Sequence, residues 1–437
     1  MKFDVLIVGA GPAGLHAART ATEAGARVGL VDDNALVGGQ IWRQGPRYRA
    51  TGRARAVLDD LEAQVRRGKL TILTGTRIVQ ALSDRKLLAE AADGASVLAY
   101  DRLIVASGAR ERFLPFPGWT LPGVTGAGGL QALIKGGMDV KGQRIVIAGT
   151  GPLLLAAAAS ARAQGARVVA IVEQAGPRAV ARFSLQLLHT PARLVQAARL
   201  RAELRATPYW FDSNVIEACG GTQLTNVRIR RGQEPLRIDC DRLACAYGLV
   251  PNTSLGAALG CEIDFASAHD PHAPAIVVDP YQATSVEHVF AAGECTGVGG
   301  MELAAAEGAI AAHAALGARE QAEAHFPARE RQRRFAGHLH RAFALDARLR
   351  ELAAPDTTFC RCEDVAFAEV AQHRSWRDAK LQTRCGMGPC QGKICGAAAQ
   401  FCFGWTPGGA RPPLSPARIG TLLLPGAAPQ APADLSA

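Results

Sequence analysis

The sequence predicts an α/β fold in which parallel sheets are flanked by helices. Two segments share the same order of strand, glycine loop, helix and strand, and a cysteine cluster lies near the C-terminus. The first segment begins with the apolar strand Lys2–Val8 and the second with the apolar strand Gln143–Ala148. Strands that alternate with helices and are joined by glycine turns are typical of parallel sheets with helices on their faces.

The composition is that of a globular protein with a sizeable core. The chain has 437 residues, of which 48% are hydrophobic and 20% charged, and at ~150 residues per domain this length predicts two or three domains. A mostly disordered or collagen-like chain is excluded. Lysine and arginine number 49 against 39 acidic residues, a net charge of +10. Because the excess is mainly arginine in helical stretches, such as Arg329 to Arg334, we expect a solvated face or a subunit contact and no nucleic-acid binding.

The sequence shows no signal for export or membrane insertion. It has no apolar run of ~18 residues, the length that a transmembrane helix needs, and its first residues lack the regions of a signal peptide. We therefore expect a cytoplasmic protein without a transmembrane segment, and peripheral membrane association is compatible with this. In such a compartment the 11 cysteines do not predict a disulfide framework.

The first glycine loop has the features of a dinucleotide-binding site. It lies between the strand Lys2–Val8 and a helix, and the strand Ala26–Val31 follows. Gly9 permits the tight turn, Gly11 lets the backbone approach a pyrophosphate, and Gly14 allows the helix to pack closely on the sheet. An acid at the end of the second strand is placed to accept hydrogen bonds from a ribose. The residues assigned to this site are Gly9, Gly11, Pro12, Ala13, Gly14 and Asp32.

The second glycine loop departs from this pattern. Gly149 and Gly151 are present, but Leu154 stands at the third glycine position. A leucine there hinders close packing of helix on strand, which puts ordinary NAD(P)H binding in doubt. Glu173, at the end of the following strand, would favour a ribose 2′-hydroxyl over a 2′-phosphate. Two interpretations stay open: a site for NAD or another nucleotide, and a Rossmann-like unit kept for architecture alone.

Strand and helix patterns return after the second unit. Ala275–Val278 and His288–Ala292 are predicted strands, and Met301–Ala315 is a predicted helix rich in alanine. Residues 319–352 are polar, rich in arginine and helical in pattern, which predicts a connecting pair of helices.

A redox-active disulfide beside a cofactor is not expected. Cys240 and Cys245 lie in Leu236–Gly248, which has a strand pattern and would place the two side chains on opposite faces. Two cysteines that point apart cannot form a disulfide without backbone movement.

Five cysteines near the C-terminus form the most specific pattern in the chain. Cys360 and Cys362 make one pair, and the second pair is either Cys390 with Cys395 or Cys385 with Cys390. Four thiolates satisfy a [2Fe–2S] cluster or a tetrahedral zinc ion, and spacing alone does not separate the two.

Helical patterns over 364–381 and 394–403 accompany these cysteines. They place thiolate-bearing loops at the N-terminal ends of two helices. Backbone N–H groups at such ends can donate hydrogen bonds to sulfur, which suits an anionic cluster.

Four further motifs lie along the chain: Gly38–Gln40, Val105–Ala109, Thr284–Ser285 and Val289–Glu294. Together they resemble the two-dinucleotide-domain flavoprotein reductases of the glutathione and thioredoxin reductase type. The resemblance implies FAD, with the last acid holding the ribityl chain of the flavin where aspartate is commoner. The cofactor contacts implied by the resemblance are Gly39, Gln40, Ser107, Gly108, Gly293 and Glu294.

The cysteine segment resembles the helical [2Fe–2S] module of the bacterioferritin-associated ferredoxin type. A flavin that takes two electrons at once gains from a one-electron carrier beside it, so this context also favours [2Fe–2S] over zinc. In the relatives the position of Cys385 is often another residue. The resemblance therefore implies Cys360, Cys362, Cys390 and Cys395 as metal ligands, with Cys385 as a neighbouring thiol.

The combination resembles, over nearly the whole chain, the α subunit of heteromeric amine and amino-acid dehydrogenases, such as D-hydroxyproline dehydrogenase, opine oxidase and hydrogen cyanide synthase. Further matching segments are Gly39–Arg43, Ala109–Val124 and Met301–Ala304. The resemblance implies a hetero-oligomer in which a β subunit with its own FAD oxidises the C–N bond. This chain would then relay electrons among the partner flavin, the [2Fe–2S] cluster and its own FAD, and no catalytic residue is assigned.

Two alternatives belong to other classes. One is a self-contained NAD(P)H-dependent FAD/iron–sulfur reductase that uses the second Rossmann-like unit. The other is a scaffold without enzymatic activity, with a vestigial nucleotide fold and a structural zinc ion. The expected organisation is a discontinuous FAD domain (1–125 and 250–318), a second Rossmann-like domain (126–249), a helical linker (319–355), the [2Fe–2S] module (356–404) and an irregular tail (405–437).

Overall fold

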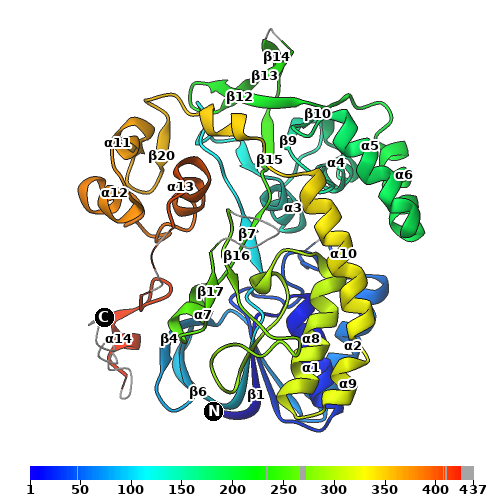
Figure 1. The fold of residues 1–437 in the computed structure, drawn as a ribbon, viewed down its shortest axis with the longest axis vertical. Helices are drawn as coiled ribbons and strands as arrows, with labels where there is room; N and C mark the ends of the chain where they lie inside the picture. The colour runs from blue at the N-terminus through cyan, green and yellow to red at the C-terminus, as the bar shows by residue number, and fades with distance from the viewer. Residues whose placement is uncertain (47, 233–234, 266–271, 407, 409–410, 425–437) are drawn as a thin grey trace.

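The computed structural model describes residues 1–46, 48–232, 235–265, 272–406, 408 and 411–424. Its first sheet has the strand order β3-β2-β1-β6-β5-β4, and β19 also pairs with β6 (Figure 1). The strands β1, β2, β3, β6 and β19 are parallel, whereas β4 and β5 form an antiparallel extension. Their bounds are β1 Lys2–Val8, β2 Val28–Val31, β3 Leu70–Leu73, β4 Arg77–Leu82, β5 Lys86–Ala91, β6 Gly94–Val105 and β19 Val289–Ala291.

Helices cover one face of this sheet. The central strand β1 directs alternate side chains into two cores, one on each face. Val5 and Ile7 of β1 belong to the core under these helices, and Leu6 to the core on the other face. The helices α1 and α8 pack so closely that a Cβ at Gly308 would overlap the carbonyl oxygen of Ala13. The bounds here are α1 Pro12–Glu23, α2 Gly52–Arg66 and α8 Met301–Ala315.

The second sheet is parallel throughout and has the order β11-β10-β9-β15-β8. A three-stranded antiparallel sheet, β12-β13-β14, lies beside it (Figure 1). The strands are β8 Val124–Gly126, β9 Arg144–Gly149, β10 Arg167–Glu173, β11 Tyr209–Trp210, β12 Ser213–Gly220, β13 Leu224–Arg231, β14 Pro235–Asp239 and β15 Arg242–Ala246. The accompanying helices are α3 Ala127–Lys135, α4 Leu153–Ala163, α5 Pro177–Gln186, the short η1 Leu187–His189 and α6 Pro191–Glu203.

The α/β class with two Rossmann-like units is thus confirmed, and both units start within two residues of the predicted strands. One expectation about strands is wrong. The predicted strand Leu236–Gly248 is two strands, β14 and β15, with Cys240 in the turn between them. Cys240 and Cys245 are therefore buried in the same core and do not point to opposite faces of one strand. Both are free thiols in the structure.

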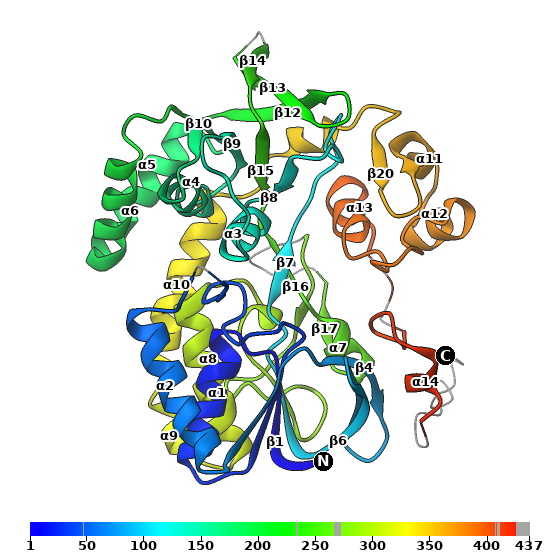
Figure 2. The ribbon, with the colours of Figure 1, turned by 180° about the vertical axis from the view of Figure 1, so that it is seen from behind.

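Two chain crossings join the sheets. β7 (Ala109–Glu111) pairs antiparallel with β16 (Leu249–Pro251), and this short ribbon lies between the two sheets (Figure 2). The segment after β16 contains α7 Ser254–Ala258, β17 Ile263–Asp264, β18 Ala275–Ile276 and η2 Glu294–Thr296. The predicted strands at 275–278 and 288–292 are present in shortened form as β18 and β19.

The predicted connecting helices are α9 (Arg319–Glu323) and α10 (Phe326–Ala342), followed by the short η3 (Ala347–Glu351). The helix α10 runs from the first unit to the second (Figure 1). Among the residues that the structure describes, none of the helices combines the length and the apolar character that crossing a membrane requires.

The cysteine-rich segment folds as a small body with its own core around Phe359 and Trp376. The predicted helix over 364–381 is two helices, because the Ser375 side chain caps the second one by accepting a hydrogen bond from Asp378 N. The elements are β20 Thr358–Cys360, β21 Val365–Ala366, α11 Phe367–Ala371, α12 Trp376–Thr383 and α13 Cys395–Phe403.

Part of the tail is ordered against the first sheet. Leu414 N donates a hydrogen bond to Val79 O (2.8 Å), and Thr421 Oγ1 donates to the buried carboxylate of Glu90 (2.5 Å). The short helix α14 (Ile419–Leu422) belongs to this segment. The expectation for 425–437 lies outside the described residues.

Candidate functional site

The first glycine loop forms a cradle lined by backbone. Gly9 has a φ of 110°, and a Cβ there would overlap the carbonyl oxygen of Ala106. A Cβ at Gly14 would overlap the carbonyl oxygen of Gly9, so the helix α1 can approach the loop only without a side chain. Gly39 packs on the same loop, because a Cβ there would lie 2.8 Å from Gly11 Cα. Glycine is therefore required at each of these contacts.

The first turn of α1 faces this cradle. Gly11 is the N-cap, and Pro12 occupies the first turn, where its missing N–H costs nothing. Helix α1 has twelve residues, and its unpaired N-terminal N–H groups attract an anion. Ala13 is buried against Gly293, where a Cβ would lie 2.8 Å from the Ala13 Cβ. The loop could therefore hold the pyrophosphate of a dinucleotide.

The Asp32 side chain holds the first glycine loop in its conformation. It is only 8% exposed. Its Oδ2 accepts a hydrogen bond from Ala10 N (2.6 Å), and its Oδ1 accepts from Asn34 N and Asn34 Nδ2 (2.8 Å each). The carboxylate thus has a structural role in fixing the loop, besides the ribose contact predicted from the sequence.

Sequence reasoning missed the next residue, Asp33. Asp33 lies at the same strand end and reaches the surface, but protein surrounds part of its carboxyl group, and this desolvation together with the neighbouring charge of Asp32 raises its pKa. The signal in the sequence was a pair of acids where the motif needs one. Gln40, by contrast, is exposed, and its Oε1 accepts a hydrogen bond from Arg43 (3.0 Å) rather than facing the loop in any described contact.

Ser107 and Gly108 lie at the end of β6, beside the first glycine loop. Both are tied to Asn252: Ser107 Oγ donates to Asn252 O (2.6 Å), Asn252 Nδ2 donates to Ser107 O (3.0 Å), and Asn252 N donates to Gly108 O (2.9 Å). Because β1, β2, β6 and β19 are parallel neighbours, their carboxyl ends meet at one edge of the sheet. Ligands of open α/β sheets bind at such an edge.

The remaining predicted residues, Gly293 and Glu294, follow β19 at this same edge. Gly293 N donates a hydrogen bond to the buried carboxylate of Glu307 (3.0 Å), which is also paired with Arg333 (3.2 Å). Burial raises the pKa of Glu294 and of Glu307. Glu307 and Arg333 were not predicted; they connect the Gly293 loop through α8 to the linker helix α10.

The second glycine loop has the same internal architecture but a covered face. Glu173 is fully buried, and its Oε2 accepts a hydrogen bond from Gly151 N (2.8 Å) and its Oε1 from Ala175 N (2.9 Å). Phe343, at the end of α10, lies in front of Gly151: a Cβ on that glycine would be 3.7 Å from the phenyl ring. Leu154 is fully buried in the core beneath. A side chain thus stands where the first loop presents open backbone.

The linker holds this cover in place. Phe343 packs edge-on against Phe183 at 5.2 Å between ring centroids. Gln174, directly after Glu173, donates through Nε2 to Ala344 O (2.8 Å) and accepts at Oε1 from Asp346 N (2.9 Å). Phe343 is therefore fixed from both sides.

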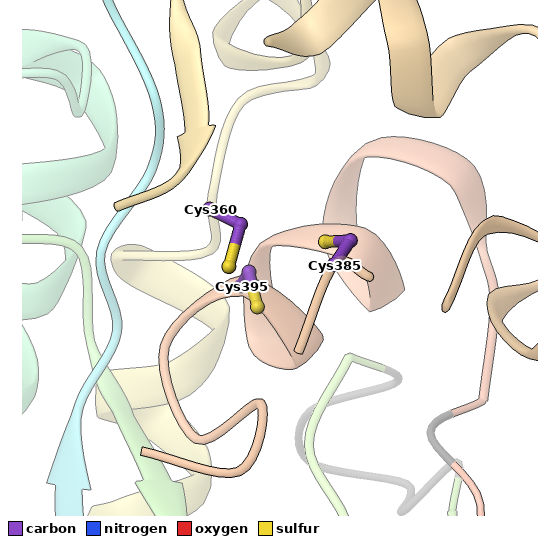
Figure 3. Close-up of side chains that lie close together, drawn as sticks. All are labelled: Cys360, Cys385 and Cys395. Carbon is purple, nitrogen blue, oxygen red and sulfur yellow. The ribbon is translucent and has the colours of Figure 1, made fainter. Parts of the chain in front are cut away.

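Three of the five clustered cysteines converge. The sulfurs of Cys360, Cys385 and Cys395 lie within 4.8 Å of one another, and all three residues are buried (Figure 3). The close approach of the other two thiols lowers the pKa of Cys360, and the approach of Cys360 and Cys385 raises that of Cys395. Gly386 N also donates to Cys360 Sγ (3.5 Å). Such a set could hold a metal centre.

Cys362 and Cys390 lie outside that group but contact each other. The pKa of the Cys362 thiol is raised by burial and by the neighbouring Cys390 thiol. The expectation that both cysteine loops sit at helix N-termini is half right. Cys395 begins α13, whereas Cys360 ends β20 and α11 starts only at Phe367.

The loop that carries Cys390 is docked against the joint between the two sheets. Arg110 of β7 donates through Nε to Lys393 O (2.9 Å) and through Nη1 to Asn252 Oδ1 (3.1 Å). Asn252 in turn holds Ser107. Burial lowers the pKa of Arg110 to about 10. A single arginine thus connects the cysteine loop to the edge where the first glycine loop lies.

The rest of the module docks through aromatic contacts. Trp119 Nε1 donates to Thr358 O (2.6 Å), and the Arg361 guanidinium lies 5.7 Å from the centroid of the Trp119 ring system. The module is therefore attached at both of its cysteine-bearing segments.

Comparison with known proteins agrees with this architecture. Residues 3–313 match the model of the family described as "Pyridine nucleotide-disulphide oxidoreductase". Hydrogen cyanide synthase subunit HcnB of Pseudomonas aeruginosa is 33% identical, covering 90% of this chain and 91% of its own. An opine oxidase subunit of Rhizobium meliloti is 31% identical, covering 96% and 98%. The solved L-proline dehydrogenase of P. horikoshii aligns over 97% of this chain and 79% of its own, with a TM-score of 0.68 and 18% identity. The chain belongs to the pyridine nucleotide-disulphide oxidoreductase family of flavoprotein oxidoreductases.

Proposed function

We propose that this chain is the FAD- and [2Fe–2S]-containing electron-transfer subunit of a heteromeric amino-acid or amine dehydrogenase. It would relay electrons between a partner flavin subunit, the cluster and its own FAD. The observation that carries the proposal is the contact chain from Ser107 through Asn252 and Arg110 to Lys393. It couples the predicted flavin edge to the cysteine loop through three side-chain contacts, so two redox groups held at these places would be neighbours.

FAD fits the first unit because its cradle consists of backbone. Gly9, Gly14 and Gly39 each exclude a side chain, and the α1 N-terminus faces the space that remains. Gly11, Pro12 and Ala13 would meet the pyrophosphate, Asp32 or Asp33 the ribose, and the Gly293–Glu294 turn the flavin side. Bound FAD would supply two-electron chemistry.

A [2Fe–2S] cluster fits the cysteines better than zinc does. Tetrahedral zinc with Zn–S bonds of about 2.3 Å needs four sulfurs that are all about 3.8 Å apart. Cys362 and Cys390 instead form a neighbouring pair beside the group of Cys360, Cys385 and Cys395, of which Cys360 and Cys395 would be the second pair of ligands. Two pairs, one for each iron, are what a [2Fe–2S] cluster with four thiolates requires. We infer that these four cysteines are the ligands.

The second unit does not support a self-contained NAD(P)H reductase. A nucleotide pyrophosphate would need the space in front of Gly151 that Phe343 occupies. Leu154 at the third glycine position is a second argument against nucleotide binding. We therefore assign residues 126–249 an architectural role between the FAD domain (1–125 and 250–318) and the module (356–404), with 319–355 as the linker that covers the loop.

The substrate class and the partner rest on the relatives. Two proteins that match most of this chain are named as subunits of hydrogen cyanide synthase and opine oxidase. Both names describe parts of multi-subunit enzymes. We infer a hetero-oligomer with a flavoprotein β subunit that oxidises the C–N bond, and a cytoplasmic place for the complex.

The test is affinity purification of the tagged chain from its own host at native expression level. We expect a second flavoprotein to co-purify and the flavin absorbance of the complex to bleach anaerobically with a D-amino acid, hydroxyproline, an opine or glycine. NADH and NADPH serve as the comparison. Bleaching of the isolated chain by either nucleotide, or recovery of a fully active single chain, would contradict the proposal.

A further inference from the structure

We propose that Cys385 is a reserve ligand for the iron–sulfur centre: it can take the place of Cys395 beside Cys360 when Cys395 is lost. The inference rests on the proposed function, because it presupposes an iron centre at these cysteines. It goes beyond that function in giving the fifth thiol of the cluster a role of its own.

The placement of Cys385 carries the inference. Its sulfur lies within 4.8 Å of both Cys360 and Cys395, although its side chain comes from a different element. In Figure 3 the Cys385 sulfur is directed toward the other two side chains rather than away from them. Cys385 is fully buried, so its thiol has no contact with solvent. An iron held by Cys360 and Cys395 would have this third sulfur within reach.

The backbone fixes Cys385 in this position. Helix α12 ends at Thr383, and its C-cap Arg384 adopts a left-handed conformation with a φ of 64° that turns the chain toward the cluster. On the other side, Gly386 has a φ of 79°, and a Cβ there would lie 2.6 Å from the Trp376 ring. Cys385 N is also held by Thr383 Oγ1 (3.2 Å). The thiol therefore does not need a rearrangement of the loop to face Cys360.

The second ligand pair has no such reserve. Cys362 and Cys390 belong to no described group of three candidate ligands. Cys402, the other cysteine on α13, packs against a different core, that of the second sheet. Loss of Cys395 and loss of Cys362 should therefore have unequal consequences. In the C395S variant the Cys385 thiol would give up its proton to the medium while the cluster is being assembled, before the site is closed, and would form the Fe–S bond that Cys395 forms in the wild type, with no change in oxidation state.

The experiment compares full-length chains purified without air: wild type, C385S, C395S, C362S, C395S/C385S and, as a matched control, C395S/C402S. Iron and acid-labile sulfide per chain and visible circular dichroism are measured. We expect C385S to equal the wild type. C395S and C395S/C402S should keep at least half of the wild-type iron with an altered dichroism spectrum, whereas C362S and C395S/C385S should lose nearly all of it.

The outcomes separate the two proposals. If the wild type contains iron but C395S loses it as completely as C395S/C385S does, Cys385 is a packing residue and the reserve role is wrong. If C385S itself loses the iron, Cys385 is an ordinary ligand and the role is also wrong. A wild type that holds zinc or no metal overturns the proposed function together with this inference. Far-ultraviolet circular dichroism and flavin content show whether each variant has folded.

Discussion

The two glycine loops have the same pattern of internal hydrogen bonds, but different segments of the chain surround them. In each, an acid at the end of the second strand accepts a hydrogen bond from a loop amide: Asp32 from Ala10, and Glu173 from Gly151. The first loop faces the backbone of Gly39, whereas Phe343 covers the second. A glycine motif therefore builds the turn, and the neighbouring segments of the fold determine whether a nucleotide can reach it.

The largest expected difference comes from glycine replacement. In Gly9→Ala the new methyl group overlaps the Ala106 carbonyl at a positive φ, and strain of this kind amounts to a few kcal/mol. We expect flavin per chain to fall at least about tenfold, since ~1.4 kcal/mol is a factor of ten. Gly149→Ala is the matched control, because its methyl group would overlap the Ala246 carbonyl at a positive φ in the same way, but in the covered loop. Visible absorbance of the purified variants measures the flavin, and equal loss in both would break the comparison.

The second prediction concerns the two acids of the first loop. Asp32→Asn turns an amide N–H toward a backbone N–H, and a buried unsatisfied donor costs about 1–3 kcal/mol. We expect a lower free energy of unfolding in urea and weaker flavin retention. Asp33→Asn should weaken flavin retention with the free energy of unfolding unchanged, because Asp33 is exposed. If Asp33→Asn kept the flavin while Asp32→Asn lost it at unchanged stability, Asp32 alone would be the ribose ligand.

The third prediction opens the covered loop. Removing the ring in Phe343→Ala should expose Gly151. The affinity for NAD⁺ should rise by about tenfold, because the ring no longer has to move away before the nucleotide binds. Calorimetric titration of NAD⁺ measures the effect. Phe335→Ala removes a ring from the same helix, where it packs on Phe183 and Arg193, and should leave the affinity unchanged. Tight NAD⁺ binding by the wild type would show that Phe343 is no barrier.

The smallest expected effect is a pH dependence in the second loop. Burial raises the pKa of Glu173, so its pKa in the folded state lies above that in the unfolded state. The stability that depends on its protonated form is fully present below the unfolded pKa, about 4.3, and is lost as the pH rises through the folded pKa. The glutamine in Glu173→Gln does not titrate. The free energy of unfolding of the wild type relative to this variant should therefore decrease between pH 4 and neutrality, an interval of about three pH units that begins near the unfolded pKa. Urea unfolding at several pH values measures it.

A control separates this effect from general titration of carboxylates. Glu320→Gln changes an exposed residue at the start of α9. Its stability relative to the wild type should stay constant over the same range. An increase in relative wild-type stability with pH would mean that the hydrogen bonds from Gly151 and Ala175 outweigh burial at Glu173.

The sequence predicted regular elements well where a local rule applies. The strand β1 and the helix α8 have the predicted bounds, because an apolar run between polar and glycine boundaries needs no distant partner to be read. It failed where a single side chain interrupts a pattern, as when Ser375 divides one predicted helix into two. It also failed at Cys240, although Asp239 and Asp241 are turn-forming residues, because the apolar residues on both sides continue the strand pattern.

The amino-acid sequence by itself determined the two Rossmann-like units, the glycines of the first loop and the grouping of cysteines near the C-terminus, because each depends on residue type at short spacing. The tertiary structure alone decided which thiols converge, that Asp32 is held by Ala10 and that Phe343 covers Gly151. Those facts arise from segments that are far apart in the chain, and their approach is set by packing of whole helices and sheets, which no local pattern encodes.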